Sequence, residues 1–208
     1  DAIARIKEYR NRYDGRRLYV SECDLQKFYD TVSHVVVRKC YHGLLKQAGK
    51  ANPGLRFEDI NRVFEAYLRC YSFPSEVYRL NGNRAFWSDN KVEEGQQRFK
   101  WVEKELLEHK VAKSRRGLMR MRIGVPQGGA LSGLIANMVL NEVDWKVKKA
   151  MTPRDLYLRY CDDMIIISTS RRQCKKLFSI YYKGSRKLKL VPHEPEKKLN
   201  FGESAFWK

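Results

Sequence analysis

Two short apolar segments near residue 160 constrain the fold of this chain more than any other feature. Residues 156–160 and 164–168 are rich in β-strand formers, and only Cys161, Asp162 and Asp163 separate them. So short a connection is typical of a tight antiparallel hairpin. The second segment is strongly apolar, which indicates that the hairpin is rooted in a core. The sequence therefore predicts a β-hairpin that carries two adjacent aspartates at its turn.

The remaining pattern predicts one further strand and several helices. Residues 17–24 are rich in β-formers and are expected to form a strand that ends at Asp24. Apolar residues at helical spacing predict a helix after Ser33 that breaks at residues 49–54, and a second helix that Pro74 ends. Three more helices are expected at residues 96–109, 130–149 and 171–187. Together these elements indicate an α+β fold, with a small antiparallel sheet and helices packed on one of its faces.

The net charge indicates the kind of binding partner, and the cysteines indicate the cellular compartment. Of the 208 residues, 42 are Lys or Arg and 24 are Asp or Glu, and the resulting charge of +18 attracts polyanions such as nucleic acids. No stretch approaches the roughly 18 apolar residues of a membrane span, so no membrane partner is expected. The five scattered cysteines form no CxxC pair, which is typical of reduced thiols in a cytoplasmic protein. The cysteines are Cys23, Cys40, Cys70, Cys161 and Cys174.

Three aspartates form the candidate chemical site. Two adjacent carboxylates about 4 Å apart repel by about 4 kcal/mol at an effective dielectric near 20, and a divalent cation relieves that repulsion. Asp is also a common turn residue, so the hairpin alone leaves metal binding and ordinary turn chemistry equally open. Asp24, at the end of the other predicted strand, supplies a third carboxylate. Such oxygen ligands suit Mg²⁺, and two Mg²⁺ ions serve in-line phosphoryl transfer.

Three motifs in order resemble those of prokaryotic reverse transcriptases of the group II intron, retron and defence-associated kinds. Residues 24–30 (DLQKFYD) resemble the first catalytic-aspartate motif of that family. Residues 124–137 (GVPQGGALSGLIAN), with the later Asp144, resemble its PQGG turn and helix, and residues 159–163 (RYCDD) resemble its YxDD hairpin. A weaker match lies at residues 188–190 and 196–197. The ordered set implies a right-hand polymerase palm that copies an RNA template into DNA.

The resemblance implies a role for each matching residue. Asp24, Asp162 and Asp163 would hold two Mg²⁺ ions, for which Mn²⁺ can substitute, with the carbonyl of Leu25 as a further ligand. Tyr29 would be an aromatic gate that excludes the 2′-hydroxyl of ribonucleotides. The other implied nucleotide-binding residues are Phe28, Gln127, Gly128 and Lys197, and those near primer or template are Tyr160, Cys161, Arg115, Arg116, Arg120 and Arg122.

The resemblance also implies what lies around the palm. Residues 1–208 resemble a palm that lacks most of its fingers strands and its thumb. The fingers and thumb domains of the same parent protein are therefore expected partners, in addition to the RNA template, the DNA product and dNTPs. Residues 75–122 read as an insertion, and the isolated chain is expected to polymerise poorly. Two alternatives stay open: an RNA-dependent RNA polymerase palm, and a catalytically silent, maturase-like RNA-binding scaffold.

Overall fold

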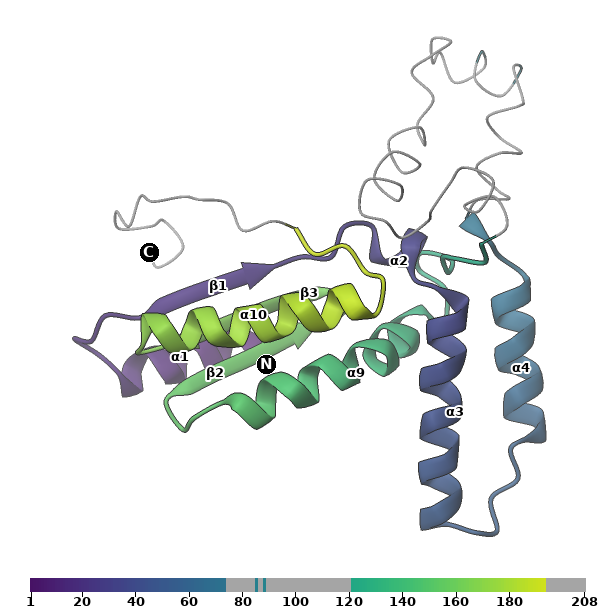
Figure 1. Cartoon of the computed structure of the whole chain (residues 1–208), viewed down its shortest axis with the longest axis horizontal. Coiled ribbons are helices and arrows are strands. Elements are labelled where there is room, and N and C mark those ends of the chain that lie inside the picture. Colours follow the sequence, from purple (N-terminus) through teal and green to yellow (C-terminus); the bar gives the residue numbers. More distant parts are fainter. Residues whose placement is uncertain (74–84, 86–87, 89–120, 194–208) are drawn as a thin grey trace.

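A three-stranded antiparallel sheet lies at the centre of the chain. The computed structural model describes residues 1–73, 85, 88 and 121–193. β2 (Asp155–Tyr160) and β3 (Asp163–Ser168) form the predicted hairpin, and β1 (Tyr19–Cys23) pairs with the other edge of β3, giving the order β1-β3-β2 (Figure 1). The predicted α+β class with a small antiparallel sheet is confirmed.

Helices α9 (Ser132–Ala150) and α10 (Arg171–Lys187) cover one face of the sheet. Met164 and Ile166 of β3 point to this face and are buried with Val139, Leu177 and other residues of the two helices. The predicted helices at 130–149 and 171–187 are thus present, the first beginning two residues later than expected. Leu134, expected on the core side of α9, is 61% exposed, because Ile135 and Val139 define the buried side of the helix.

A helix that the sequence analysis did not predict, α1 (Ala2–Arg12), packs on the opposite face of the sheet. Tyr9 is buried against Leu156 and Ile167, whose side chains alternate with those that face α9 and α10. The Tyr9 hydroxyl donates to the carbonyl of Arg154 at 2.5 Å. Helices therefore lie on both faces rather than on one. Tyr9 is the one buried residue of α1, too weak an apolar pattern for the helix to be predicted.

The short helix α2 (Phe28–Thr31) leads into an antiparallel helical pair, α3 (His34–Ala51) and α4 (Glu58–Arg69), which Figure 1 shows beside the sheet and its helices. The Tyr41 ring stacks on Phe64 with centroids 3.7 Å apart. The predicted break at 49–54 begins too early, since α3 continues through Gly49 to Ala51. Ile60 and Val63, expected on the inner side of α4, are 56% and 60% exposed, since only one flank of α4 contacts α3.

The C-terminal end of α10 directs the following segment toward the end of β1. The N–H of Leu190 donates to the carbonyl of Ser185 and that of Lys189 to the carbonyl of Arg186, at 3.1 and 3.0 Å. These two bonds form a Schellman motif, whose residue after the helix cap adopts left-handed backbone. That residue is Lys189, with a φ of 60°. The turn buries Leu190 and Val191.

Replacing Lys189 by glycine is expected to stabilise the fold. A residue with a Cβ loses about 1–2 kcal/mol of stability when its backbone is left-handed, and glycine avoids this cost. Glycine also makes the unfolded chain more flexible, which offsets part of the benefit, so a net gain of roughly 0.5–1 kcal/mol is expected. Thermal unfolding should show a midpoint roughly 1–4 °C higher. Lys183→Gly, inside α10, is the control and should lower the midpoint. An unchanged or lower midpoint for Lys189→Gly would contradict the strain inferred for this turn.

Several predicted elements lie outside the described residues, namely the loop at 75–95 apart from residues 85 and 88, the helix at 96–109, and the final strand at 204–207. Within the described part of the chain, no helix is long and apolar enough to cross a membrane. All five cysteines are free thiols.

Candidate active site

The end of β1 and the β2–β3 hairpin bring the three aspartates to one end of the sheet. Cys23 pairs with Met164 across the β1–β3 ladder, so Asp24 and Asp163 are the next residues at this end of the two strands. Burial, and then the negative charges of Asp24 and Asp163, raise the pKa of Asp162 above its usual range. Burial and the charge of Asp24 raise the pKa of Asp163 in the same way. The charge of Asp24 therefore acts on both carboxyl groups of the hairpin.

The hairpin turn contains two residues rather than three, because Asp163 already belongs to β3 and pairs with Tyr160. Cys161, the first turn residue, has left-handed backbone with a φ of 53°. A positive φ at this position belongs to the hairpin turns that match strand twist, where glycine is the preferred residue. A cysteine at this place must be held by its surroundings.

The segment after α10 borders Asp24 on the side away from β3. The N–H of Gln26 donates to the carbonyl of Val191 at 2.7 Å, and the N–H of His193 donates to the carbonyl of Asp24 at 3.0 Å. Neither bond uses the carbonyl of Leu25, the further metal ligand implied by the first motif. The His193 ring lies 3.5 Å from the Asp24 carboxylate. Sequence reasoning missed His193, which no motif of the chain singled out.

Tyr29 joins all three motifs. Its carbonyl accepts from the N–H of Val125 at 2.6 Å, which attaches the first motif to the residues just before the PQGG turn. Burial, and then the nearby side chain of Cys161 in the hairpin turn, raise the pKa of Tyr29, so these two side chains lie close to one another. Phe28 is buried with 1% exposed, and its ring meets that of Tyr29 edge-on. Phe28 therefore supports the Tyr29 ring from the core and is not itself open to a nucleotide.

Residues 126–129 form the predicted Gly-rich turn. The N–H of Gly129 donates to the carbonyl of Pro126 at 3.0 Å, and Gly128 has a φ of 76°, as the third residue of a type II turn requires. No atom lies within 4 Å of where a Cβ of Gly128 would stand, and Gln127 is exposed. The turn is thus open to an approaching ligand. Its inner side is held by Ser132, whose hydroxyl lies 2.7 Å from that of Tyr67 on α4.

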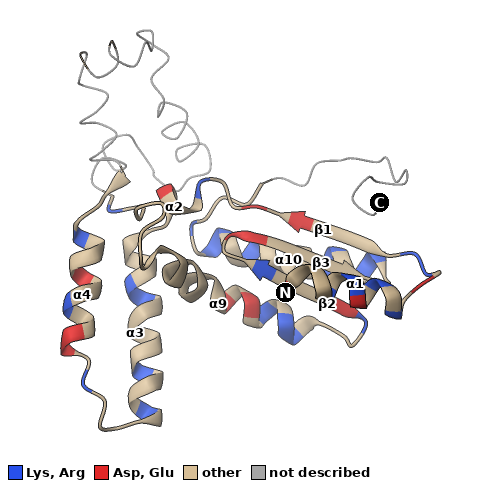
Figure 2. Cartoon of the chain, turned by 180° about the vertical axis from the view of Figure 1, so that it is seen from behind, with Lys and Arg blue, Asp and Glu red and all other residues tan. Residues whose placement is uncertain are grey.

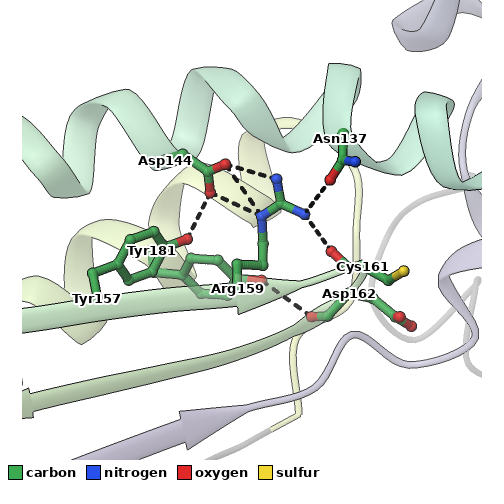
Figure 3. A network of polar contacts seen from close by, with 7 residues as sticks. All are labelled: Asn137, Asp144, Tyr157, Arg159, Cys161, Asp162 and Tyr181. Atoms are coloured by element: carbon green, nitrogen blue, oxygen red, sulfur yellow. Dashed lines mark hydrogen bonds and ion pairs between the residues drawn. The ribbon is translucent and has the colours of Figure 1, made fainter. Parts of the chain in front are cut away.

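A buried polar network fastens the hairpin to α9 (Figure 3). The guanidinium of Arg159 donates to both carboxylate oxygens of Asp144 and to the carbonyl of Cys161. The Tyr157 hydroxyl donates to Asp144 at 2.6 Å, and that of Tyr181 donates to the carbonyl of Asp162 at 3.4 Å. The quoted motifs already contain Asp144, Asn137 and Arg159, but the sequence did not predict that these residues bind one another. Tyr157 and Tyr181 belong to no motif.

The donor set suits a hard divalent cation. The raised pKa values of Asp162 and Asp163 show carboxylates that a positive charge would stabilise in their ionised form. Carboxylate and carbonyl oxygens are ligands that Mg²⁺ accepts, and Mg²⁺ keeps several of its waters. Across the described residues, no three acidic, histidine or cysteine side chains stand close enough to enclose an ion by themselves.

The other predicted site residues are divided between exposed positions and residues that the structure does not describe. Tyr160 is 80% exposed beside the hairpin turn, and Arg122 is exposed before the PQGG segment. Lys197, Arg115, Arg116 and Arg120 lie outside the described residues. Figure 2 shows Lys and Arg spread over α1, α3 and α10. The exposed basic residues of α10 are Arg171, Arg172, Lys175, Lys176, Lys183 and Lys187.

Comparison with known families assigns the chain. Residues 87–199, more than half of its length, match the family described as reverse transcriptase (RNA-dependent DNA polymerase). This chain belongs to the reverse transcriptase family. The matched range includes the PQGG turn and the YCDD hairpin, and the Asp24 motif lies before it. The palm-like sheet of this reverse transcriptase domain is the part that carries the three aspartates.

The reverse transcriptase domain is also similar to a solved structure of apo telomerase from Candida tropicalis, truncated from the C-terminal domain. The TM-score is 0.49 at 18% sequence identity, and the similarity covers 98% of the domain and 36% of that chain. The domain thus spans about a third of the length of that structure. Among curated proteins, no sequence matches the domain.

Proposed function

We propose that this domain is the catalytic core of an RNA-directed DNA polymerase, which transfers nucleotides from dNTPs to the 3′-hydroxyl of a primer paired with an RNA template. The observation that carries the proposal is the meeting of three motifs at Tyr29. Its backbone binds the PQGG segment, its side chain lies beside Cys161 of the YCDD turn, and Asp24 lies five residues before it. Packing alone does not require these sequence motifs to converge on one end of a sheet that also carries three interacting carboxylates.

In this proposal Asp24, Asp162 and Asp163, with the carbonyl of Leu25, hold two Mg²⁺ ions. Such ions supply the charge that activates the attacking hydroxyl and stabilises the leaving pyrophosphate. The open turn at Gln127 and Gly128 lets backbone approach the incoming nucleotide, since glycine presents no side chain there. Exposed Tyr160 borders the primer end, and the basic face of α10 contacts phosphates.

Tyr29 carries the choice of DNA over RNA product. Tyr29→Ala is expected to raise rNTP incorporation on the order of 10- to 100-fold, because a steric wall of this size supplies a few kcal/mol of discrimination. Primer extension on an RNA template, with dNTPs or rNTPs supplied separately, measures the change. Tyr29→Phe is the matched control: it keeps the ring packed on Phe28, removes only the hydroxyl near Cys161, and should still reject rNTPs.

The experiment that tests the function is Mg²⁺-dependent dNTP incorporation by the full-length protein on a primed RNA template. Incorporation that stops when Mg²⁺ is removed supports the proposal. RNA binding without incorporation would favour the catalytically silent scaffold instead. Preference of the unmodified protein for rNTPs would favour an RNA-dependent RNA polymerase and remove the role given to Tyr29.

We further infer that the chain is the palm of a longer enzyme of the prokaryotic group II intron, retron or defence-associated kind. Its motifs resemble those of this group, and residues 75–122 are the segment that we assign to a lineage-specific insertion. Fingers strands that clamp the triphosphate and a thumb that grips the duplex are then supplied by the rest of the parent protein. Residues 1–208 alone should therefore extend primers poorly.

A further inference from the structure

The backbone of the YCDD turn is held from the side of the helices by two side-chain donors, one for each turn residue. Arg159 donates to the carbonyl of Cys161, and Tyr181 donates to the carbonyl of Asp162 (Figure 3). Tyr181 is a fully buried residue of α10, and Arg159 lies on β2 two residues before Cys161, with its side chain 7% exposed and bound to Asp144 of α9. The turn is therefore fixed by specific bonds in addition to its strand ladder.

Arg159 is itself held rigidly. Its Nε donates to Asp144 Oδ1 at 2.9 Å and its Nη2 donates to Asp144 Oδ2 at 2.7 Å, the two-pronged geometry that arginine forms with a carboxylate. Nη1 donates to the Asn137 side chain at 3.2 Å and to the carbonyl of Cys161. The Tyr157 hydroxyl also donates a hydrogen bond to Asp144 Oδ1, at 2.6 Å. The guanidinium of Arg159 is thus held in a fixed position by Asp144 of α9 while it binds the turn.

The conformation that Arg159 holds is an unfavourable one. Cys161 has a φ of 53°, and left-handed backbone costs a residue with a Cβ roughly 1–2 kcal/mol. Such conformations persist where the surroundings determine them, and they gather at functional sites. A hydrogen bond from a charged donor contributes about 1.5–3 kcal/mol, enough to offset that cost. Asp162 directly follows this residue, so the backbone at Cys161 sets where the Asp162 carboxylate points.

We propose that Arg159 is a positioning residue for catalysis: anchored on Asp144, it holds the left-handed backbone of Cys161 and so aims the Asp162 carboxylate. The proposal rests on the function proposed above. Reacting groups must be held within roughly 0.5 Å of their productive geometry, and a misplacement of about 1 Å can reduce turnover about 10²-fold. A purely structural ion pair between α9 and β2 would leave turnover unchanged once the fold is preserved by other means.

The decisive variant replaces the buried ion pair with apolar residues of similar volume: Arg159→Met with Asp144→Leu and Tyr157→Phe. Exchanging a buried ion pair for well-packed hydrophobic residues is often neutral or stabilising, so this variant should unfold at close to the normal temperature. It should nevertheless incorporate dNTPs about 10²-fold more slowly, with an unchanged KM for dNTP. Amide hydrogen exchange at residues 161–164 should accelerate, and this readout does not depend on activity.

The matched control is the partly buried ion pair between α3 and α4, exchanged in the same manner as Arg38→Met with Glu65→Leu. It should leave both turnover and exchange at the hairpin unchanged. If the apolar triple variant fails to fold, Arg159→Lys decides instead, because an ammonium group lacks the spaced nitrogens with which the guanidinium forms the two-pronged pair with Asp144 and also reaches Cys161. Normal turnover and normal exchange at 161–164 in the folded variant would overturn the proposal. An unmodified protein that incorporates no dNTP, while exchange still accelerates in the variant, would overturn the proposed function and leave the positioning of the turn standing.

Discussion

Exchanging both hairpin aspartates for asparagine, Asp162→Asn with Asp163→Asn, should abolish dNTP incorporation and at the same time raise thermal stability. The loss should reach 10³-fold or more, since metal ions supply on the order of several kcal/mol of transition-state stabilisation and each 1.36 kcal/mol is a factor of ten. The gain in stability follows from burial and from mutual repulsion, which raise the pKa of both carboxyl groups in the folded chain. Neutral amides remove both costs.

The sign of the pH dependence follows from the same pKa shifts. A carboxyl group whose pKa is higher in the folded than in the unfolded state binds more protons when folded, so its ionisation lowers stability as the pH rises through that range. Without Mg²⁺, the unmodified protein should therefore lose stability on going from acid toward neutral pH relative to the asparagine variant. Thermal unfolding at pH 4 and pH 7, beside primer extension, measures both effects. A variant that is less stable at neutral pH, or that still incorporates dNTPs, contradicts this account of the site.

Gly124→Ala has the largest expected effect on stability. Gly124 has a φ of 83°, and a Cβ there would stand 2.8 Å from the carbonyl oxygen of Asp30 and 2.9 Å from the Cβ of Phe73. Left-handed backbone costs about 1–2 kcal/mol and overpacking a further 1–3 kcal/mol, so a loss of roughly 2–5 kcal/mol is expected. The same residue donates from its N–H to the carbonyl of Val32 at 2.8 Å, and a shift there would carry Val125 away from Tyr29.

Two other glycines separate the causes of that loss. Gly128 also has a positive φ, but the described residues leave open space around the methyl group that Gly128→Ala would add. Denaturant unfolding should therefore show a loss of only about 1–2 kcal/mol in the free energy of unfolding. Gly43→Ala lies within α3 with nothing within 4 Å, and it should stabilise by up to about 1 kcal/mol. If the Gly124 variant is no less stable than the Gly128 variant, the backbone near Asp30 can move away from the new methyl group without a loss of stability.

The sequence could predict the elements that local pattern specifies. The hairpin was predictable because two strongly apolar segments flank its turn, and α10 because its apolar residues follow a regular helical period. The boundary errors have a common cause: tertiary contacts override local signals, so α3 continues past Gly49 to Ala51. α1 was not predictable, because most of its surface faces solvent and Tyr9 alone is buried.

Within the candidate site, sequence order identified the carboxylates but not what supports them. Arg159 belongs to the RYCDD motif, but the motif does not show that its side chain holds the carbonyl of Cys161, and Tyr181 reads as a core aromatic. His193 comes beside Asp24 only through the turn at Lys189, a residue type that rarely adopts left-handed backbone. Contacts between side chains that are far apart in the sequence depend on tertiary packing, and no local sequence pattern predicts them.

The hydrogen bond that joins Phe73 to Ile123 has a consequence for how this domain can vary. The N–H of Phe73 donates to the carbonyl of Ile123 at 2.9 Å, so positions 73 and 123 are neighbours in the fold. Between two points held together in this way, each doubling of the length of chain costs only about 0.6 kcal/mol of loop-closure entropy. Descendants of this sequence could therefore gain or lose residues between these two positions while the end of the sheet that carries the three aspartates keeps its geometry.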